Sequence, residues 1–178
     1  MTLQQQKPMH FINYKTVSLI LKSRDLFYPP KYILDEVGIK PGVCVLDYGC
    51  GPGSYSIAVA ELLAGTGKVF ALDIHPLAVN QVSQIAKMKK LTNIKTILSN
   101  CDTGLPSNSV DIILLYYLFN DLENSEKVLC ELYRVIKPHG ILSLSEFNLN
   151  KISPRLEMTQ LFRLVKKNKA THTFMKTS

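Results

Sequence analysis

The sequence lacks a long hydrophobic run. Its longest uninterrupted apolar stretch covers residues 112–119, whereas a membrane-spanning helix requires roughly 18 apolar residues. The first ten residues, MTLQQQKPMH, also lack the apolar segment of a secretory signal peptide. We therefore expect a cytoplasmic protein.

Cysteines with metal-ligand spacing are also missing. The four cysteines, Cys44, Cys50, Cys101 and Cys130, stand far apart, without a C-x-x-C motif or a cluster of histidine and cysteine. This spacing argues against a disulfide scaffold and against a zinc site. We expect no bound metal, and thiols that are buried or line a site.

Acidic residues are scarce near the C-terminus. The net charge is +7, and residues 151–178 hold seven lysines and arginines against Glu157 alone. The segment KKNK at 166–169 concentrates this charge. Such a run is usually a solvated sheet edge that discourages aggregation. The alternative is a docking surface for an anionic partner, either RNA or, as we prefer, a weakly bound anionic membrane.

Repeats, low-complexity tracts and linkers are absent too, and short apolar segments instead alternate with helical patterns. Strands are predicted at 43–47, 68–73, 93–99, 110–118 and 141–147, and the fourth is expected to be buried on both faces. Helical patterns cover 56–65, with Val59 and Leu62 on one face and Gly65 as C-cap, then 76–90, which begins at Pro76. A third runs from 128 to Ile136 and ends before Pro138 and Gly140.

The two ends of the chain depart from this alternation. Two helices are predicted within residues 10–38, where they could lie across the carboxyl end of the first strand. Ser153 and Pro154 resemble the N-cap and first residue of a short helix. Residues 161–176 alternate on both sides of KNKA, which indicates an antiparallel hairpin. The predicted class is α/β: a doubly wound, mostly parallel, seven-stranded Rossmann-like sheet with a C-terminal antiparallel hairpin and N-terminal cover helices.

A glycine-rich segment, LDYGCGPGSY, follows the first predicted strand. Ligands of open parallel sheets bind beyond the carboxyl ends of the strands, and glycine lets the backbone approach them closely. The dinucleotide fingerprint would need a glycine at Ser54, and GTGKV at 65–69 fits a phosphate-binding loop poorly. What remains is D-x-G-x-G-x-G, beginning at Asp47. A carboxylate would repel a pyrophosphate but suits a ligand with a cationic amine, and S-adenosylmethionine (SAM) carries an ammonium, a sulfonium and no phosphate.

On these residues the chain resembles the class I SAM-dependent methyltransferases, within them the branch of the ubiquinone/menaquinone-biosynthesis C-methyltransferases. The motifs are IKPGVCVLDYGCGPG, ALDIHP, LPSNSVDIILLYYLFNDL and ELYRVIKPHG, and the resemblance is strong over residues 39–147. It implies one domain over 1–178, with N-terminal helices in 1–38, a cofactor-binding core in 39–147, and a short helix and closing hairpin in 148–178.

The resemblance also implies a set of cofactor contacts. The glycine loop would cradle the methionine part of SAM, Asp73 would accept hydrogen bonds from both ribose hydroxyls, and Ile74 and His75 would flank the adenine. Asn100 with Cys101 is preferred over Asp102 for the adenine amino group. The predicted cofactor-binding residues are Asp47, Gly49, Cys50, Gly51, Gly53, Asp73, Ile74, His75, Asn100, Cys101 and Tyr116.

Several nearby side chains have ordinary structural interpretations. Tyr116 and Tyr117 could line the methyl-donor pocket or pack in the core, and Asn120 and Asp121 could cap a loop. His139 and His172 are expected at the surface. For Arg24 the alternatives are a contact with the SAM carboxylate and a place on a solvated helix face, and the second is preferred. No catalytic base is predicted, because methyl transfer depends chiefly on holding the acceptor in line and excluding water.

The acceptor is expected to be a small molecule. Enzymes of this class that methylate amino groups in nucleic acids typically carry [DN]-P-P-[YF] after the fourth strand, where this chain has LYYLFND. The alternatives are a SAM-binding module or a subunit that needs a partner for activity, or an RNA or protein methyltransferase. Dehydrogenase activity is disfavoured by Asp47 and Ser54. The oligomeric state is not predicted.

Overall fold

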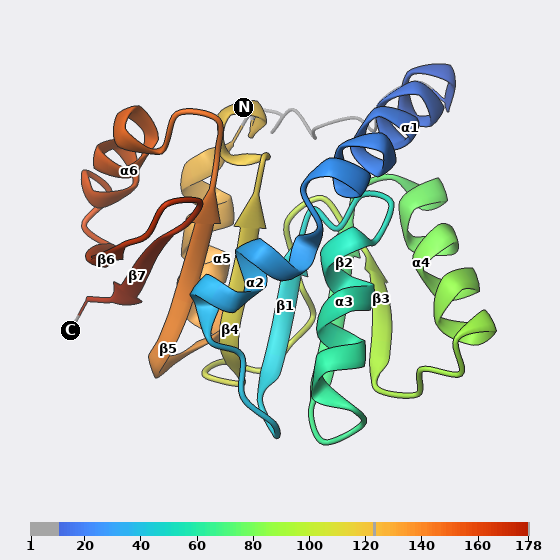
Figure 1. The fold of residues 1–178 in the computed structure, drawn as a ribbon. Helices are drawn as coiled ribbons and strands as arrows, with labels where there is room; N and C mark the ends of the chain where they lie inside the picture. The colour runs from blue at the N-terminus through green and yellow to red at the C-terminus, as the bar shows by residue number, and fades with distance from the viewer. Residues whose placement is uncertain (1–10, 123, 178) are drawn as a thin grey trace, which may run out of the picture.

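The computed structural model describes residues 11–122 and 124–177. They form a seven-stranded sheet with helices on both faces (Figure 1). The strands are β1 (Cys44–Tyr48), β2 (Lys68–Asp73), β3 (Ile94–Leu98), β4 (Val110–Tyr116), β5 (Ile136–Ser145), β6 (Phe162–Lys167) and β7 (His172–Lys176). The helices are α1 (Phe11–Phe27), α2 (Pro30–Val37), α3 (Ser54–Leu63), α4 (Pro76–Met88), α5 (Ser125–Val135) and α6 (Leu149–Glu157), with a 3-10 turn η1 (Phe119–Asp121).

The strand order is β3-β2-β1-β4-β5-β7-β6. The first five strands are parallel, and β7 runs antiparallel to both β5 and β6. The order reverses between β1 and β4, and this reversal is where a doubly wound sheet opens a crevice at its carboxyl edge. The predicted fold class, including the closing hairpin, is confirmed.

The central strand β4 is buried on both faces, as its apolar sequence predicts. Ile113 and Leu115 belong to the core under α5 and α6, whereas Ile112 and Leu114 belong to the core under α2 and α3. This alternation follows from the two-residue period of a strand. The position of β4 in the middle of the sheet leaves neither face to solvent.

Several predicted helix boundaries are wrong. Helix α5 ends at Val135, and Ile136 already begins β5, where it pairs with Val110 of β4. In α3 the left-handed C-cap is Ala64 rather than Gly65, and Leu62 is 49% exposed. That helix therefore buries Val59 together with Leu63.

The short helix near the C-terminus begins earlier than predicted. Asn148 is the N-cap of α6, and its side-chain oxygen accepts a hydrogen bond from Lys151 N at 3.3 Å. Ser153 and Pro154 lie inside the helix. Ser153 Oγ instead lies 2.5 Å from Nδ1 of His172 on β7.

His172 is buried, with 3% of its side chain exposed, so its predicted place at the surface is wrong. Burial lowers the pKa of this imidazole below its ordinary value. His139 is exposed, as expected. Cys130 is exposed on α5, against the expectation of buried or site-lining thiols, whereas Cys50 and Cys101 are buried.

Helices α1 and α2 both lie within residues 10–38, where two helices were predicted, and Gly38 caps α2 in the left-handed conformation. Figure 1 shows α1 above the carboxyl ends of β1 and β2, where its cover role was expected. In the described part of the chain, no helix combines the length and apolar character needed to cross a membrane.

Candidate functional site

The glycine loop turns the chain from β1 into α3. Gly49 N and Cys50 N both donate hydrogen bonds to Leu72 O, each at 2.8 Å, so the loop is tied to the neighbouring strand β2. Gly49 has a φ of +84°, and a Cβ there would lie 2.4 Å from Leu118 Cδ2. A side chain at this position is therefore strained by the backbone conformation and would also displace the tip of the Leu118 side chain.

Two carboxylates stand on either side of the loop. Asp47 lies in β1 with 2% of its side chain exposed, and Ser56 Oγ donates to its Oδ2 at 2.5 Å. Asp73 ends β2 and accepts hydrogen bonds from Gly51 N and His75 N, each at 2.8 Å. An ionised carboxylate has about four acceptor sites, so Asp73 is held in place by these bonds and retains capacity to accept from a ligand.

Burial controls the protonation of both acids. It raises the pKa of Asp47 from 3.8 to about 6, and the hydrogen bond from Ser56 offsets part of this rise. Burial also raises the pKa of Asp73, partly offset by the backbone hydrogen bonds from His75 and Gly51. Each charge is costly without a cation, and a cationic ligand group beside Asp47 would stabilise its ionised form.

A cavity of about 430 Å³ opens at this edge of the sheet. Six of the predicted residues line it, namely Asp47, Gly49, Cys50, Gly51, Asp73 and Tyr116. Nine residues that the sequence analysis did not assign to the site complete the wall: Ile20, Leu21, Arg24, Pro52, Ser54, Tyr55, Tyr117, Leu118 and Phe147. We call this space the loop cavity.

The other five predicted contacts lie outside the lining of the loop cavity. The added Cβ of a side chain at Gly53 would lie 2.7 Å from Val82 Cγ2, so this glycine allows the loop to pack on α4. Ile74 is half-buried, Asn100 is exposed, and Cys101 borders a separate cavity with Glu131.

The fifth, His75, is the N-cap of α4, where its Nδ1 accepts from Leu77 N at 3.1 Å. Its ring is stacked on Tyr14 of α1 with centroids 4.2 Å apart. The cofactor roles of all five residues stay predictions.

Tyr14 is a residue near the site that the sequence analysis missed. Its side chain is 8% exposed and packs with Cys50 against α4. Burial, followed by the charges of Asp73 and Cys50, raises the pKa of its hydroxyl to about 12. The hydroxyl is therefore protonated at neutral pH and is available as a hydrogen-bond donor beside the loop.

Arg24 does not lie on a solvated helix face, so the interpretation preferred from the sequence is wrong. Its guanidinium lies 4.8 Å from the ring centroid of Tyr117 and 5.7 Å from that of Tyr55, within the range of cation–π contacts. Arg24 Nη2 pairs with Asp25 Oδ1 at 2.7 Å, and Asp25 accepts a hydrogen bond from Ser54 Oγ. These contacts fasten α1 to the first turn of α3.

Tyr116 and Tyr117 play different parts in the wall. Tyr116 is buried, and its hydroxyl lies 2.9 Å from Ser143 Oγ, so it serves both as core and as wall. Tyr117 has a φ of +54°, which side chains rarely adopt. Its ring lies between Arg24 and Phe147, whose ring centroid is 5.1 Å away. Such strain is typical of functional sites.

The predicted loop residues Asn120 and Asp121 lie in η1, outside the lining of the loop cavity. Asn120 Oδ1 accepts a hydrogen bond from Arg155 Nη1 at 2.9 Å. Glu146, directly after β5, accepts a hydrogen bond from Phe119 N at its Oε1, at 2.8 Å, and so ties η1 to the end of that strand. This segment shapes the loop after β4 through Leu118, which does line the cavity.

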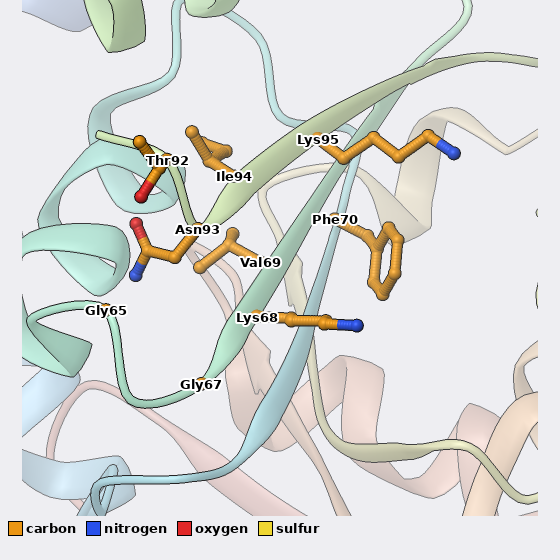
Figure 2. A pocket seen from close by; sticks show the side chains of 9 residues that line it. All are labelled: Gly65, Gly67, Lys68, Val69, Phe70, Thr92, Asn93, Ile94 and Lys95. Atoms are coloured by element: carbon orange, nitrogen blue, oxygen red, sulfur yellow. The ribbon is translucent and has the colours of Figure 1, made fainter. Parts of the chain in front are cut away.

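A second cavity, of about 410 Å³, lies at the opposite, amino-terminal ends of β2 and β3 (Figure 2). Figure 2 shows Lys68, Phe70 and Lys95 on one side of these strands, with Val69 and Ile94 on the other. Ligands of open parallel sheets bind at the carboxyl edge. The loop cavity is therefore the candidate functional site.

Known proteins share this architecture. A crystal structure of a SAM dependent methyltransferase from Aquifex aeolicus matches with a TM-score of 0.84 and 25% identity, over 96% of this chain and 100% of that one. A demethylmenaquinone methyltransferase from Tropheryma whipplei is 34% identical over 130 residues, which are 72% of this chain and 50% of the relative.

A ubiquinone/menaquinone biosynthesis C-methyltransferase UbiE from Hydrogenovibrio crunogenus is 31% identical over 126 residues, which are 66% of this chain and 47% of that protein. The chain thus spans about half the length of the curated relatives it matches. A family model described as a methyltransferase domain matches residues 39–177, which include the glycine loop, both carboxylates and the closing hairpin. The chain therefore belongs to the methyltransferase-domain family.

Proposed function

We propose that the protein binds SAM in the loop cavity and transfers its methyl group to a small, largely apolar acceptor. The observation that carries this proposal is the bare glycine loop between two carboxylates on adjacent strands, the buried Asp47 and the partly buried Asp73. This arrangement offers a negative group for an ammonium and a second one for vicinal hydroxyls, with close backbone contact between them.

The proposed roles follow from the positions of the side chains. Asp47 faces the amino group of SAM, Gly49 and Gly51 contact its methionine part through the backbone, and Asp73 accepts from the ribose hydroxyls. Arg24 lies at the wall with a permanent positive charge, which suits the SAM carboxylate. When bound, SAM supplies an activated methyl group on a sulfonium.

The chain itself contributes positioning and exclusion of water. Tyr55, Tyr116, Tyr117 and Leu118 form an apolar wall on the side of β4, and helix α1 covers the cavity from above. Holding an acceptor in line with a methyl carbon in such a water-poor space supplies most of the catalysis that methyl transfer requires. No side chain of the wall is assigned as a general base.

The names of the relatives favour an acceptor of the quinone class. Demethylmenaquinone is the acceptor that the name of the Tropheryma relative gives, and the aromatic side chains of the wall, among them Tyr117 and Phe147, offer surface against which a flat ring packs favourably. We therefore propose an aromatic, lipid-soluble acceptor for this chain.

Isothermal titration calorimetry with SAM, S-adenosylhomocysteine and NAD in parallel tests the cofactor. We expect the first two to bind and NAD not to bind. Asp73→Ala should weaken SAM binding by about 1.5 to 3 kcal/mol, because hydrogen bonds to a charged group are lost. The matched control is Asp35→Ala, which removes an exposed carboxylate on α2, outside the loop cavity. Unchanged affinity of Asp73→Ala would remove Asp73 from the site.

Methyl transfer is tested separately with radiolabelled SAM and a demethylated quinol. Labelled product that depends on the protein is the expected result. Tight SAM binding without any labelled product would instead favour a binding module or a subunit that needs a partner.

A further inference from the structure

Large apolar side chains are exposed around the mouth of the loop cavity. Leu26, Phe27 and Tyr28, at the end of α1 and just after it, have exposed fractions of 81%, 79% and 71%. Tyr32 on α2 is 69% exposed, and Phe147, which lines the cavity, is 91% exposed. We call these five residues the apolar rim. Three of them are consecutive in the chain, and exposed apolar side chains that gather in this way mark a site of interaction.

The apolar rim continues the wall of the cavity outward. Residues four positions apart lie on one face of a helix, so Ile20, Arg24 and Tyr28 form a row, and Tyr28 N donates to Arg24 O at 2.8 Å. The first two of these residues line the cavity. On the other side of the mouth, Phe147 contacts Tyr117, whose ring lies against Arg24.

Basic side chains flank the apolar rim on the α1–α2 side. Between residues 19 and 35 the exposed charged residues are Lys22, Lys31 and Asp35. The half-buried Asp25 pairs with Arg24 and accepts a hydrogen bond from Ser54. The exposed charged side chains on this side of the apolar rim therefore carry a net positive charge, to which the hairpin lysines add.

The basic hairpin is fastened to the same surface. Glu36, near the end of α2, accepts hydrogen bonds from Ala170 N at 3.1 Å and Thr171 Oγ1 at 2.9 Å. Tyr32 lies one helical turn before Glu36. The hairpin turn, with exposed Lys166, Lys167 and Lys169, is thereby held beside the apolar rim, which the sequence alone did not indicate.

We propose that the apolar rim and the hairpin turn together dock the protein on the surface of an anionic lipid bilayer, with the mouth of the loop cavity toward the lipid. Aromatic side chains with a polar tip, such as Tyr28 and Tyr32, suit the interface between headgroups and acyl chains. Lysines around them add attraction to anionic headgroups. A second copy of the chain is a poorer occupant, because a two-fold contact would bring the same positive charges together.

This docking goes beyond methyl transfer and does not require a bound cofactor. Its consequence for the proposed function is a route for the acceptor: a lipid-soluble molecule would enter the cavity past Phe147 without crossing water. The side chains of the apolar rim, which are exposed to water in the free protein, would be buried in lipid when the protein is docked.

Co-sedimentation with vesicles tests the proposal, using phosphatidylcholine alone and phosphatidylcholine mixed with phosphatidylglycerol, without SAM. We expect the wild type to bind the anionic vesicles and to bind the neutral ones much more weakly. The double variant Leu26→Ser/Phe27→Ser should lower the partition coefficient at least about tenfold, because two large side chains no longer insert. Met88→Ser, an exposed apolar residue at the far end of α4, is the matched control and should bind like the wild type.

The triple variant Lys166→Gln/Lys167→Gln/Lys169→Gln tests the charges. It should lose roughly a hundredfold in affinity for anionic vesicles at low salt and change little on neutral ones. Calorimetry with SAM on all variants should give the wild-type affinity, which shows that the loop cavity is intact and keeps this test separate from that of methyl transfer.

Three outcomes would overturn the docking proposal. The wild type could fail to sediment with anionic vesicles, or the rim variant could bind as well as the wild type. Alternatively, analytical ultracentrifugation could show a dimer that the rim variant abolishes, with no vesicle binding, which would assign the surface to a second copy. Vesicle binding without SAM binding would leave docking standing and contradict the proposed function.

Discussion

Replacing Asp47 with asparagine should stabilise the free protein while abolishing its binding of SAM. Asp47 is buried in β1, and burial is the main reason that its pKa rises from 3.8 to about 6. An acid with a higher pKa in the folded than in the unfolded state binds more protons when folded, between those two values. Ionised Asp47 therefore destabilises the fold above about pH 6, and this cost disappears as the pH falls through that window.

The magnitude follows from the shift. About two pKa units at 1.36 kcal/mol each give roughly 3 kcal/mol at neutral pH. The Asp47→Asn side chain keeps an oxygen for Ser56 Oγ but loses the charge assistance of that hydrogen bond, about 1 kcal/mol. We expect a net gain of about 2 kcal/mol in the free energy of unfolding, or a Tm higher by about 4 to 8 °C for a chain of this size.

Urea denaturation followed by circular dichroism measures this gain, since the chain has no tryptophan for fluorescence. The difference between variant and wild type should grow from about pH 4 to pH 6 and stay constant above it. Asp35→Asn, which removes an exposed carboxylate on α2, is the matched control. A variant that is no more stable than the wild type at neutral pH, with a difference independent of pH, would refute the reasoning.

Other changes test the loop, the protonation of Asp47 and a helix cap. Gly51→Val should abolish SAM binding in calorimetry yet leave the fold intact, because an added Cβ meets only Leu21 at 3.9 Å, although φ is +51°; retained binding would contradict the loop assignment. SAM affinity of the wild type should fall about tenfold per pH unit below about pH 6, as protons compete for Asp47; a flat profile would contradict its contact with the ammonium. Asn148→Ala should cost about 1 kcal/mol in thermal unfolding without changing SAM affinity, because α6 loses its N-cap.

The sequence predicted the architecture because hydrophobic periods report burial directly. The apolar run of β4 predicted a strand covered on both faces, the alternation around KNKA indicated an antiparallel hairpin, and both predictions are confirmed. It also predicted the polar floor of the site. Asp47 and Asp73 lie near the carboxyl ends of β1 and β2, the glycines follow β1, and the carboxyl ends of parallel strands share one edge.

Local signals failed where two interpretations fit the same residues. Pro154 is compatible with the first turn of a helix, but the turn before it is anchored by Asn148, so the proline lies inside α6. Ile136 continues the helical stripe of α5, yet its backbone is already extended and pairs with Val110. In both cases the sequence is compatible with two helix boundaries, and contacts in the folded structure decide which of them is formed.

The sequence by itself determined the sheet, the glycine loop and the two carboxylates, because these depend on residues that are neighbours in the chain or on strand ends that share an edge. Only the tertiary structure decided which side chains close the site. Arg24 and Phe147 come from distant segments and meet at the cavity because α1 crosses the sheet edge and β5 ends beside it, and Tyr14 of α1 stacks on His75 next to the loop. Periodicity shows which face of a helix is apolar, but it does not show which surface that face will cover.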